Sequence, residues 1–339
     1  GFDESLGMRA GGGMFLPEDH PDAVNAKLPF DPIDSFLWPN LPYAVQYNNE
    51  QRMEPVGHVT DYLTDNAIAA ISANRNRPFF LYLAYNAPHT PLQATRADYE
   101  ALSGISDHTT RVYAAMIRQL DRRIGDLMAH LKREGLDENT LVVFTSDNGG
   151  AWYTGIEGLN APYRGWKATF FEGGIRVPLF MRWPGRIAPG TVAQAPGSHL
   201  DMFATFAAVA GAAIPSDRAM DSINLLGGIV PGMAAEPRPA PLFWRSGDYR
   251  AVRAGDWKLS VGRGSQTAWL YNLAEDPTEQ RNLASAQPER VAELRALIEA
   301  QNRDLPPPMW PGLVEAPVRI DVPLNAPWQD GQDWIYWTN

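Results

Sequence analysis

Two continuous apolar runs, separated by a long amphipathic helix, constrain the fold of this chain more than any other feature. The runs are PFFLYLAY at 78–85 and LVVF at 141–144, and such runs are typical of strands buried on both faces. Between them, apolar residues recur at helical spacing: Val112, Met116, Leu120, Ile124, Leu127, Met128 and Leu131. A helix at 60–75, with Thr60 as its predicted N-cap, precedes the first run. This alternation predicts an α/β fold with a mostly parallel sheet sandwiched by helices.

After residue 174 the pattern of the sequence changes. The segment IRVPLFMRWPG at 175–185 predicts another strand, and Ser198 with Asp201 has the spacing of a capping box at the start of a helix. Later, short alternating segments joined by turns predict a small antiparallel sheet, and an amphipathic helix follows it. We therefore predict a large domain at 1–240, a small antiparallel α+β subdomain at 241–304 and a surface-wrapping tail at 305–339.

Charge and composition exclude several classes of protein. The 339 residues carry a formal net charge of −10, which argues against nonspecific binding to nucleic acid or to an anionic membrane surface. The chain has no cysteine, so it has no disulfide, no thiolate metal site and no cysteine nucleophile. No apolar run reaches the ~18 residues of a membrane span. An anionic substrate would need a local positive site, and the composition leaves the compartment undecided.

Asp147 and Asn148 directly follow the second apolar run. Ligands bind at the carboxyl ends of parallel strands in open α/β sheets, and two adjacent oxygen donors suit a hard cation such as Ca²⁺ or Mg²⁺. The same residues open the tetrapeptide Asp-Asn-Gly-Gly, which is also strong turn chemistry. From these residues alone, a metal site and a simple turn are both open.

Two further segments carry candidate catalytic groups. His89 lies in NAPHTP, just past the first apolar run, where an imidazole could donate to an anion or act as a general acid. Lys167 lies in YRGWKATFFEGG, a glycine-rich segment in which an ammonium could hold an oxyanion, and Arg164 could do similar work. The alternatives are a surface-loop histidine and two solvated bases.

Aromatic residues flank this candidate site. They are Trp152, Tyr153, Trp166 and Phe170. These rings could stack on an aromatic or sugar ring of a substrate. Packing of the loop against the sheet explains them equally well.

Taken together, the motifs resemble the formylglycine-dependent, arylsulfatase-like sulfatases of the alkaline-phosphatase-like superfamily. The residues that carry the resemblance are PFFLYLAYNAPHTPLQ, LDRRIGDLMAHLKREGLDENTLVVFTSDNGG and YRGWKATFFEGGIRVPLFMRWPGRI. DWKLSVG and LYNLAEDPTEQRNL also resemble the small C-terminal sheet domain of that family. The resemblance runs from about residue 60 to residue 300.

This resemblance implies roles for individual residues. Asp147 and Asn148 would be two ligands of the active-site cation, usually Ca²⁺. His89 would contact the sulfate ester near the leaving-group oxygen, and Lys167 would hold a sulfate oxygen. The implied activity is sulfate-ester hydrolysis on a small molecule or a saccharide, and the implied compartment is periplasmic or secreted.

One part of the family pattern is absent. The family's nucleophile is a formylglycine made from Cys or Ser in a Cys/Ser-x-Pro-x-Arg motif, and this chain has neither form. SAQPER at 285–290 comes closest, with one residue too many. We expect an N-terminal segment or a second chain to supply the nucleophile and further metal ligands, and we expect this chain alone to be inactive. An unpaired sheet edge would also favour self-association into a homo-oligomer.

Two other functions remain open at this point. One is hydrolysis of phosphonate or phosphate esters, because the superfamily uses the same metal-and-anion design. The other is a noncatalytic binding protein on a sulfatase scaffold. Paired assays on sulfate and phosphonate esters would separate the enzymes.

Overall fold

The computed structural model divides the chain into two compact units. It describes residues 1–8, 12–238, 241–262, 268–307, 309–310, 312 and 315–338. The first unit comprises residues 1–140, 153–157 and 323–327, and the second comprises residues 141–152, 158–322 and 328–339. The observed division therefore falls after Thr140, whereas the predicted domains were 1–240, 241–304 and 305–339. Residue 240, the predicted boundary, lies outside the described residues.

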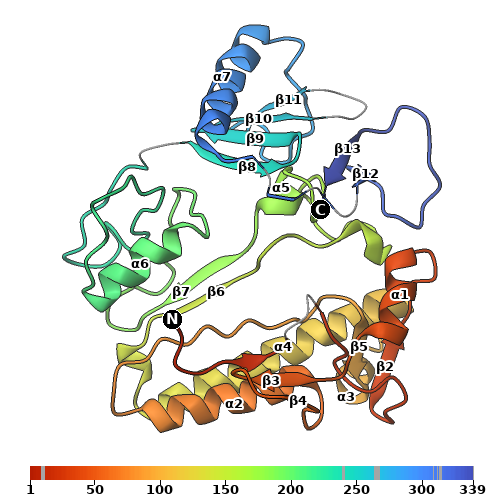
Figure 1. The fold of residues 1–339 in the computed structure, drawn as a ribbon, viewed down its shortest axis with the longest axis vertical. Helices are drawn as coiled ribbons and strands as arrows, with labels where there is room; N and C mark the ends of the chain where they lie inside the picture. The colour runs from red at the N-terminus through yellow and green to blue at the C-terminus, as the bar shows by residue number, and fades with distance from the viewer. Residues whose placement is uncertain are drawn as a thin grey trace. The chain divides into compact units, whose positions relative to one another are not determined.

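The first unit is built on two helices that pack side by side, α2 and α4 (Figure 1). Its helices are α1 (Pro32–Asn40), α2 (Val59–Asn74), α3 (Arg96–Glu100), α4 (His108–Arg133) and a 3₁₀ turn (Asp137–Asn139). Its strands are β1 (Leu6–Gly7), β2 (Ala23–Ala26), β3 (Val45–Tyr47), β4 (Arg52–Met53) and β5 (Leu92–Thr95). β1, β3 and β4 pair antiparallel, as do β2 and β5. The core includes Phe15, Val59, Leu63, Leu92, Val112 and Met116.

Local hydrogen bonds explain where the two long helices begin. Asp107 caps α4, because its Oδ1 accepts the N–H of Thr110 at 2.8 Å. The residue that caps α2 is His58, whose Nδ1 accepts the N–H of Thr60 at 3.2 Å. The predicted N-cap, Thr60, is therefore wrong by two residues, because a ring nitrogen takes the place of the expected hydroxyl.

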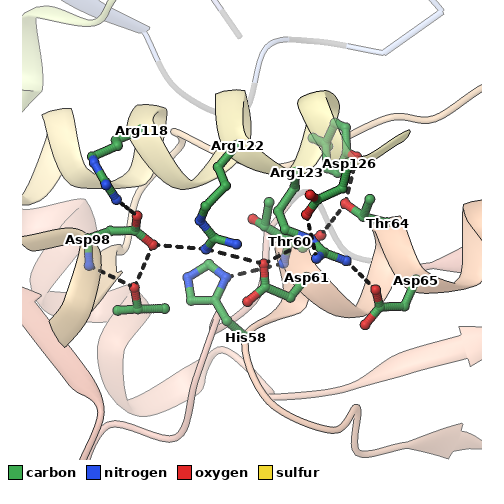
Figure 2. Close-up of polar contacts among 12 residues, drawn as sticks. His58, Thr60, Asp61, Thr64, Asp65, Asp98, Arg118, Arg122, Arg123 and Asp126 are labelled. Carbon is green, nitrogen blue, oxygen red and sulfur yellow. Dashed lines mark hydrogen bonds and ion pairs between the residues drawn. The ribbon is translucent and has the colours of Figure 1, made fainter. Parts of the chain in front are cut away.

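A network of charged residues joins α2, α3 and α4 (Figure 2). Asp98 is 2% exposed and accepts a hydrogen bond from Thr95 Oγ1 at 2.8 Å. It also pairs with Arg118, and with Arg122 Nη2 at 3.1 Å. Burial acts to raise the pKa of Asp98, but the bonds from Thr95 and Arg122 outweigh it, so its pKa is lowered. The network therefore holds this buried carboxylate in its charged form.

The predicted strand at 78–85 is wrong. The segment forms no strand in the structure, and Phe80 and Tyr82 are 61% and 71% exposed. An apolar run becomes a buried strand only where neighbouring strands satisfy its backbone and helices cover its side chains. No described strand pairs with this segment.

The second apolar run does form the predicted strand, but it is not part of a buried parallel sheet. β6 (Val142–Thr145) pairs antiparallel with β7 (Leu179–Arg182) as an isolated two-stranded ribbon, which Figure 1 shows. Phe144 and Phe180 stack on each other at 6.2 Å and are 38% and 65% exposed. Every strand pair among the described residues is antiparallel, so the predicted parallel sheet is not found there.

The second unit contains the small antiparallel sheet that the sequence predicts. Its further elements are α5 (Glu172–Ile175), α6 (Asp201–Ala210), β8 (Leu242–Ser246), β9 (Tyr249–Ala254), β10 (Trp257–Val261), β11 (Ala268–Asn272) and α7 (Pro288–Asp304). The strand order is β11-β10-β9-β8, and α7 lies along this sheet (Figure 1). Leu294 and Ile298 of α7 pack against Val252, Leu259 and Leu270 of the strands.

The tail, predicted to wrap the surface, also contains regular structure. It contains a pair of antiparallel strands, β12 (Glu315–Arg319) and β13 (Trp334–Thr338), and β13 contacts β9. Alternation explains this pairing, because Val318 and Ile335 face each other in register and are both buried. None of the helices within the described part of the chain is both long and apolar enough to cross a membrane.

Candidate active site

The loop that follows β6 folds back on itself. The N–H of Gly149 donates to the carbonyl oxygen of Gly174 at 3.0 Å, and the N–H of Lys167 donates to that of Gly150 at 2.9 Å. We call the place where residues 149–150 meet residues 167–174 the crossing. Asn160 stabilises it, because its Oδ1 accepts the N–H of Gly150 at 2.8 Å. The predicted acid–amide end of this loop and its lysine end are therefore joined through backbone hydrogen bonds.

Glycine is required at the crossing because two backbones approach closely. A Cβ at residue 149 would lie 1.8 Å from the carbonyl oxygen of Gly173. A Cβ at residue 174 would lie 2.2 Å from the carbonyl oxygen of Thr169. The pairs Gly149–Gly150 and Gly173–Gly174 thus mark the two chain segments that cross.

The crossing brings Lys167 within electrostatic reach of Asp147. Burial lowers the pKa of the Lys167 ammonium, and the carboxylate of Asp147 opposes that shift. Ser146, between β6 and these residues, donates from its Oγ to the carbonyl oxygen of Asn148 at 3.0 Å. On this ordered loop, the half-buried ammonium of Lys167 can stabilise an anion. The carboxylate of Asp147 can bind a metal cation.

Asp147 and Asn148 fit a calcium or magnesium ion by chemistry but do not complete a site. A carboxylate and a side-chain amide supply hard oxygen donors, whereas Ca²⁺ takes about 6–8 oxygens. Over the part of the chain that the structure describes, no three His, Cys, Asp or Glu side chains gather in a way that could hold a metal. Further ligands would have to come from elsewhere.

His89 belongs to the first unit and lies beside Tyr153. Its Nδ1 lies 2.8 Å from the carbonyl oxygen of Thr90, so Nδ1 carries a proton and donates it. In the neutral ring Nε2 is then an acceptor, and it lies 3.4 Å from the hydroxyl of Tyr153. Nε2 would donate a proton to a leaving group only from the imidazolium form. Whether His89 and Lys167 face one anion stays a prediction, because they belong to different units.

Arg164, a predicted substrate-binding residue, is held by side chains of its own unit. Its guanidinium donates to Asp321 at 2.8 Å, to Asp333 at 2.9 Å and to the hydroxyl of Tyr271 at 2.9 Å. These contacts give Arg164 an internal structural role, and they lend no support to a role in binding substrate.

The aromatic residues of the loop are mostly packed. Trp166 is 4% exposed and Trp152 is 9% exposed, with the ring of Trp152 lying 5.7 Å from that of Trp337. Phe170 stacks on Tyr249 at 4.4 Å. Packing, the alternative to substrate stacking, accounts for these three residues, whereas Tyr153 is only half-buried and contacts His89.

Sequence reasoning missed two residues that hold the loop. Asn160 bonds to both ends of the crossing, but a single asparagine in a loop gives no signal of this. Glu172 is 2% exposed and pairs with Lys258, which is fully buried in β10. A lysine within the apolar segment WKLSV was a usable signal, because lysine is almost never fully buried unless it is paired.

Comparisons with known proteins agree with these features. The sulfatase family model matches residues 19–212, which is more than half of the chain. Over 243 residues the chain is 34% identical to the N-acetylgalactosamine-6-sulfatase of Canis lupus familiaris, covering 68% of this chain and 45% of that enzyme. Over 313 residues it is 33% identical to the steryl-sulfatase of Mus musculus, covering 81% and 48%.

A solved structure is similar over a longer stretch. The crystal structure of Ps i-CgsB in complex with k-i-k-neocarrahexaose superposes with a TM-score of 0.75 at 30% identity, covering 91% of this chain and 68% of that one. This chain belongs to the sulfatase family, whose solved structures have the alkaline-phosphatase-like fold. It spans about half the length of the curated relatives that it matches.

Proposed function

We propose that this chain is part of a sulfatase that hydrolyses sulfate esters. The single observation that supports this most strongly is the crossing at Gly149 and Gly174, because it joins the donor pair to Lys167. A sulfate ester carries negative charge on oxygens that must be stabilised as the ester bond breaks. An ammonium and a cation-holding pair on one ordered loop match that requirement.

Each residue has a distinct role in this proposal. Lys167 binds a sulfate oxygen, and its partial burial strengthens that interaction because little water competes for the ammonium. Asp147 and Asn148 supply two oxygen ligands to a Ca²⁺ or Mg²⁺ ion, which when bound would neutralise charge on the sulfuryl group. His89, oriented by Thr90 and next to Tyr153, protonates the leaving oxygen from its imidazolium form.

In this proposal, a separate segment supplies the nucleophile. The sequence has no Cys/Ser-x-Pro-x-Arg motif, from which the resembled family makes its nucleophile. An N-terminal segment or a second chain would therefore carry the formylglycine and the remaining cation ligands. The exposed apolar residues of the 78–85 segment and of the β6–β7 ribbon, including Phe80, Tyr82, Phe144 and Phe180, are candidate surfaces for packing it.

A sulfated saccharide is the substrate class that the comparisons favour. The relatives named above include an enzyme for N-acetylgalactosamine 6-sulfate and a protein solved with a neocarrahexaose. The steryl-sulfatase at 33% identity supports sulfate-ester chemistry in general and not a particular alcohol.

The test compares sulfate with phosphonate esters. The full chain would be assayed on p-nitrophenyl sulfate, on p-nitrophenyl phenylphosphonate and on N-acetylgalactosamine 6-sulfate, alone and with a formylglycine-bearing N-terminal segment added. We expect no turnover by the chain alone and sulfate release with the segment. Faster phosphonate hydrolysis would replace the proposal with the phosphonate function, and no turnover on any substrate by the assembled protein would favour a noncatalytic binding protein.

A further inference from the structure

A lysine of β10, Lys258, lies fully buried between two carboxylates. Its Nζ is 2.9 Å from Glu172 Oε1 and 2.9 Å from Glu279 Oε1. The side chains of Lys258, Glu172 and Glu279 are 0%, 3% and 0% exposed. Burial raises the pKa of Glu279, and the charge of Lys258 opposes that rise. Charges withdrawn from water in this way are tolerated only in a well-defined geometry, so the three groups hold one another in place.

The cluster of Lys258, Glu172 and Glu279 contacts the active-site loop through Glu172. Besides the ion pair of its side chain, the backbone N–H of Glu172 donates to Glu279 Oε2 at 2.5 Å. The next residue, Gly173, donates its N–H to the carbonyl oxygen of Arg164 at 2.7 Å. Gly174 then accepts the bond from Gly149. The buried ion cluster is therefore connected to both the lysine side and the donor-pair side of the crossing.

Aromatic packing supports the same attachment. Phe171, which is fully buried, contacts Trp269 and Tyr271 of β11 with ring centroids 5.7 and 6.2 Å apart. The N–H of Phe170 donates to the hydroxyl of Tyr249 in β9 at 2.9 Å. Phe170 and Phe171, which precede Glu172 in the loop, thus pack against the small antiparallel sheet. The sheet is attached to the active-site loop through these contacts.

We propose that Lys258, Glu172 and Glu279 are positioning residues that set the location of Lys167 and of the Asp147–Asn148 pair. The effect of this positioning on catalysis rests on the proposed function. The claim that the cluster fixes the position of the loop does not depend on that function. Apolar packing alone would let the loop slide, because dispersion contacts are weakly directional. The hydrogen bond from Lys258 Nζ to Glu172 Oε1 imposes direction as well as distance, and the ion pair with Glu279 adds attraction at 2.9 Å. Arg176 adds a weaker contact to Glu172 at 3.6 Å.

The test uses lysine signals in the full chain. Its lysines are Lys27, Lys132, Lys167 and Lys258, so selective ¹³C labelling gives few resonances, and Lys167→Arg assigns the resonance of interest. In Lys258→Met, which keeps the volume and removes the charge, the Lys167 resonance should move toward that of exposed Lys132. Amide hydrogen exchange at 164–174 should rise at least tenfold.

Two further variants make the result decisive. Leu294→Ala loosens the same sheet from α7 without touching the ion cluster, so it should leave the Lys167 resonance and the 164–174 exchange unchanged. If Lys258→Met does not fold, Glu172→Gln takes its place, since it keeps the side-chain shape and removes one charge. Unchanged signals in the cluster variants, or equal changes in Leu294→Ala, would overturn the positioning role.

Activity adds an independent readout. In the protein assembled with its nucleophile segment, Lys258→Met should lower kcat for a sulfate ester by about 10²-fold. The reason is that a misplaced Lys167 stabilises the charge of the transition state less well. KM should change less than threefold. A drop confined to KM would overturn the role. If the wild-type assembly turns over nothing, the proposed function fails, while the resonance and exchange results still decide whether the cluster positions the loop.

Discussion

Gly149 and Gly174 meet backbone to backbone, with the N–H of the first 3.0 Å from the carbonyl oxygen of the second. This contact holds the segment that begins at Asp147 next to the segment that contains Lys167. It depends on the absence of side chains at both residues.

Gly149→Ala should therefore destabilise the protein and loosen the loop. The new Cβ would meet the carbonyl oxygen of Gly173 at 1.8 Å, so the backbone has to shift at a cost of about 3 kcal/mol in the free energy of unfolding. Gly125→Ala is the matched control, because nothing lies within 4 Å of a Cβ there and the residue is inside α4. The control should stabilise by ~0.5–1 kcal/mol. Urea unfolding measures both, and equal effects would contradict the close approach.

Lys167→Ala should cost more activity than Lys167→Arg in the assembled enzyme. Removing a charge that stabilises the developing oxyanion lowers kcat/KM by about 10²–10³-fold, whereas arginine keeps the charge. Lys132→Ala, which removes an exposed lysine of α4, should leave kcat/KM unchanged. Initial rates on p-nitrophenyl sulfate give the comparison, and equal losses for Ala and Arg would argue against a charge-based role.

Calcium should bind weakly to this chain by itself. Asp147 and Asn148 offer two donor side chains, far fewer than the ion's usual shell, so we expect a Kd above ~10⁻³ M. Isothermal titration calorimetry of the wild type and of Asp147→Asn tests this expectation. Submicromolar binding that Asp147→Asn abolishes would show that the chain holds a complete site.

His58 should make stability depend on pH near neutrality. It is 3% exposed, its Nε2 lies 3.2 Å from the carbonyl oxygen of Gln93 and its Nδ1 accepts from Thr60, so the folded protein holds it neutral. Burial lowers its pKa, with Asp61 and Asp98 opposing the shift. The unfolded chain then binds a proton more readily. Its contribution to stability is complete above about pH 6.5 and is lost as the pH falls below that value.

The measurement compares unfolding free energies from pH 7.5 down to 5. His58→Asn keeps a helix cap but does not titrate, so it should flatten the slope in this window, which for one proton is at most ~1.4 kcal/mol per pH unit. A slope that persists unchanged in His58→Asn would assign the dependence to other groups.

Asp98 should dominate the ion network that Figure 2 shows. Asp98→Ala should cost about 2–3 kcal/mol at pH 7, because it leaves two arginines and a buried threonine without their acceptor. Arg122→Ala should cost under ~1 kcal/mol, because its side chain is 44% exposed and Arg118 still pairs with Asp98.

The pH dependence gives an additional check on Asp98. Since its pKa is lowered in the folded state, its stabilisation is present above about pH 4 and is lost as the pH falls through the folded value. Chemical unfolding between pH 5 and pH 2.5 should show a shallower acid loss in Asp98→Ala than in the wild type. The reverse order of costs for Asp98→Ala and Arg122→Ala would contradict the network as described.

The longer helices α2, α4, α6 and α7 could be predicted from the sequence because their signals are local. The apolar stripe of α4 recurs every three or four residues, and a cap such as Asp107 acts within one turn. The small antiparallel sheet was also predictable, since neighbouring strands joined by short turns pair with each other. Strand 78–85 failed because an apolar run does not specify which strands will lie beside it.

The candidate site divides in the same way. The identity of Asp147, Asn148, His89 and Lys167 as candidates came from residue chemistry and from the family resemblance. The roles of Arg164 and Trp152 could not be assigned, because their partners lie far away in sequence: Asp321 for Arg164 and Trp337 for Trp152.

The amino-acid sequence by itself established the longer helices α2, α4, α6 and α7, the small sheet, the family resemblance and the chemical groups available at the site. The tertiary structure alone revealed the crossing at Gly149 and Gly174, the ion cluster at Lys258 and the fact that no described strand pairs with 78–85. The physical reason is range: helical periodicity and turns act over a few residues, whereas backbone crossings and buried ion pairs depend on residues that meet only after the chain has folded.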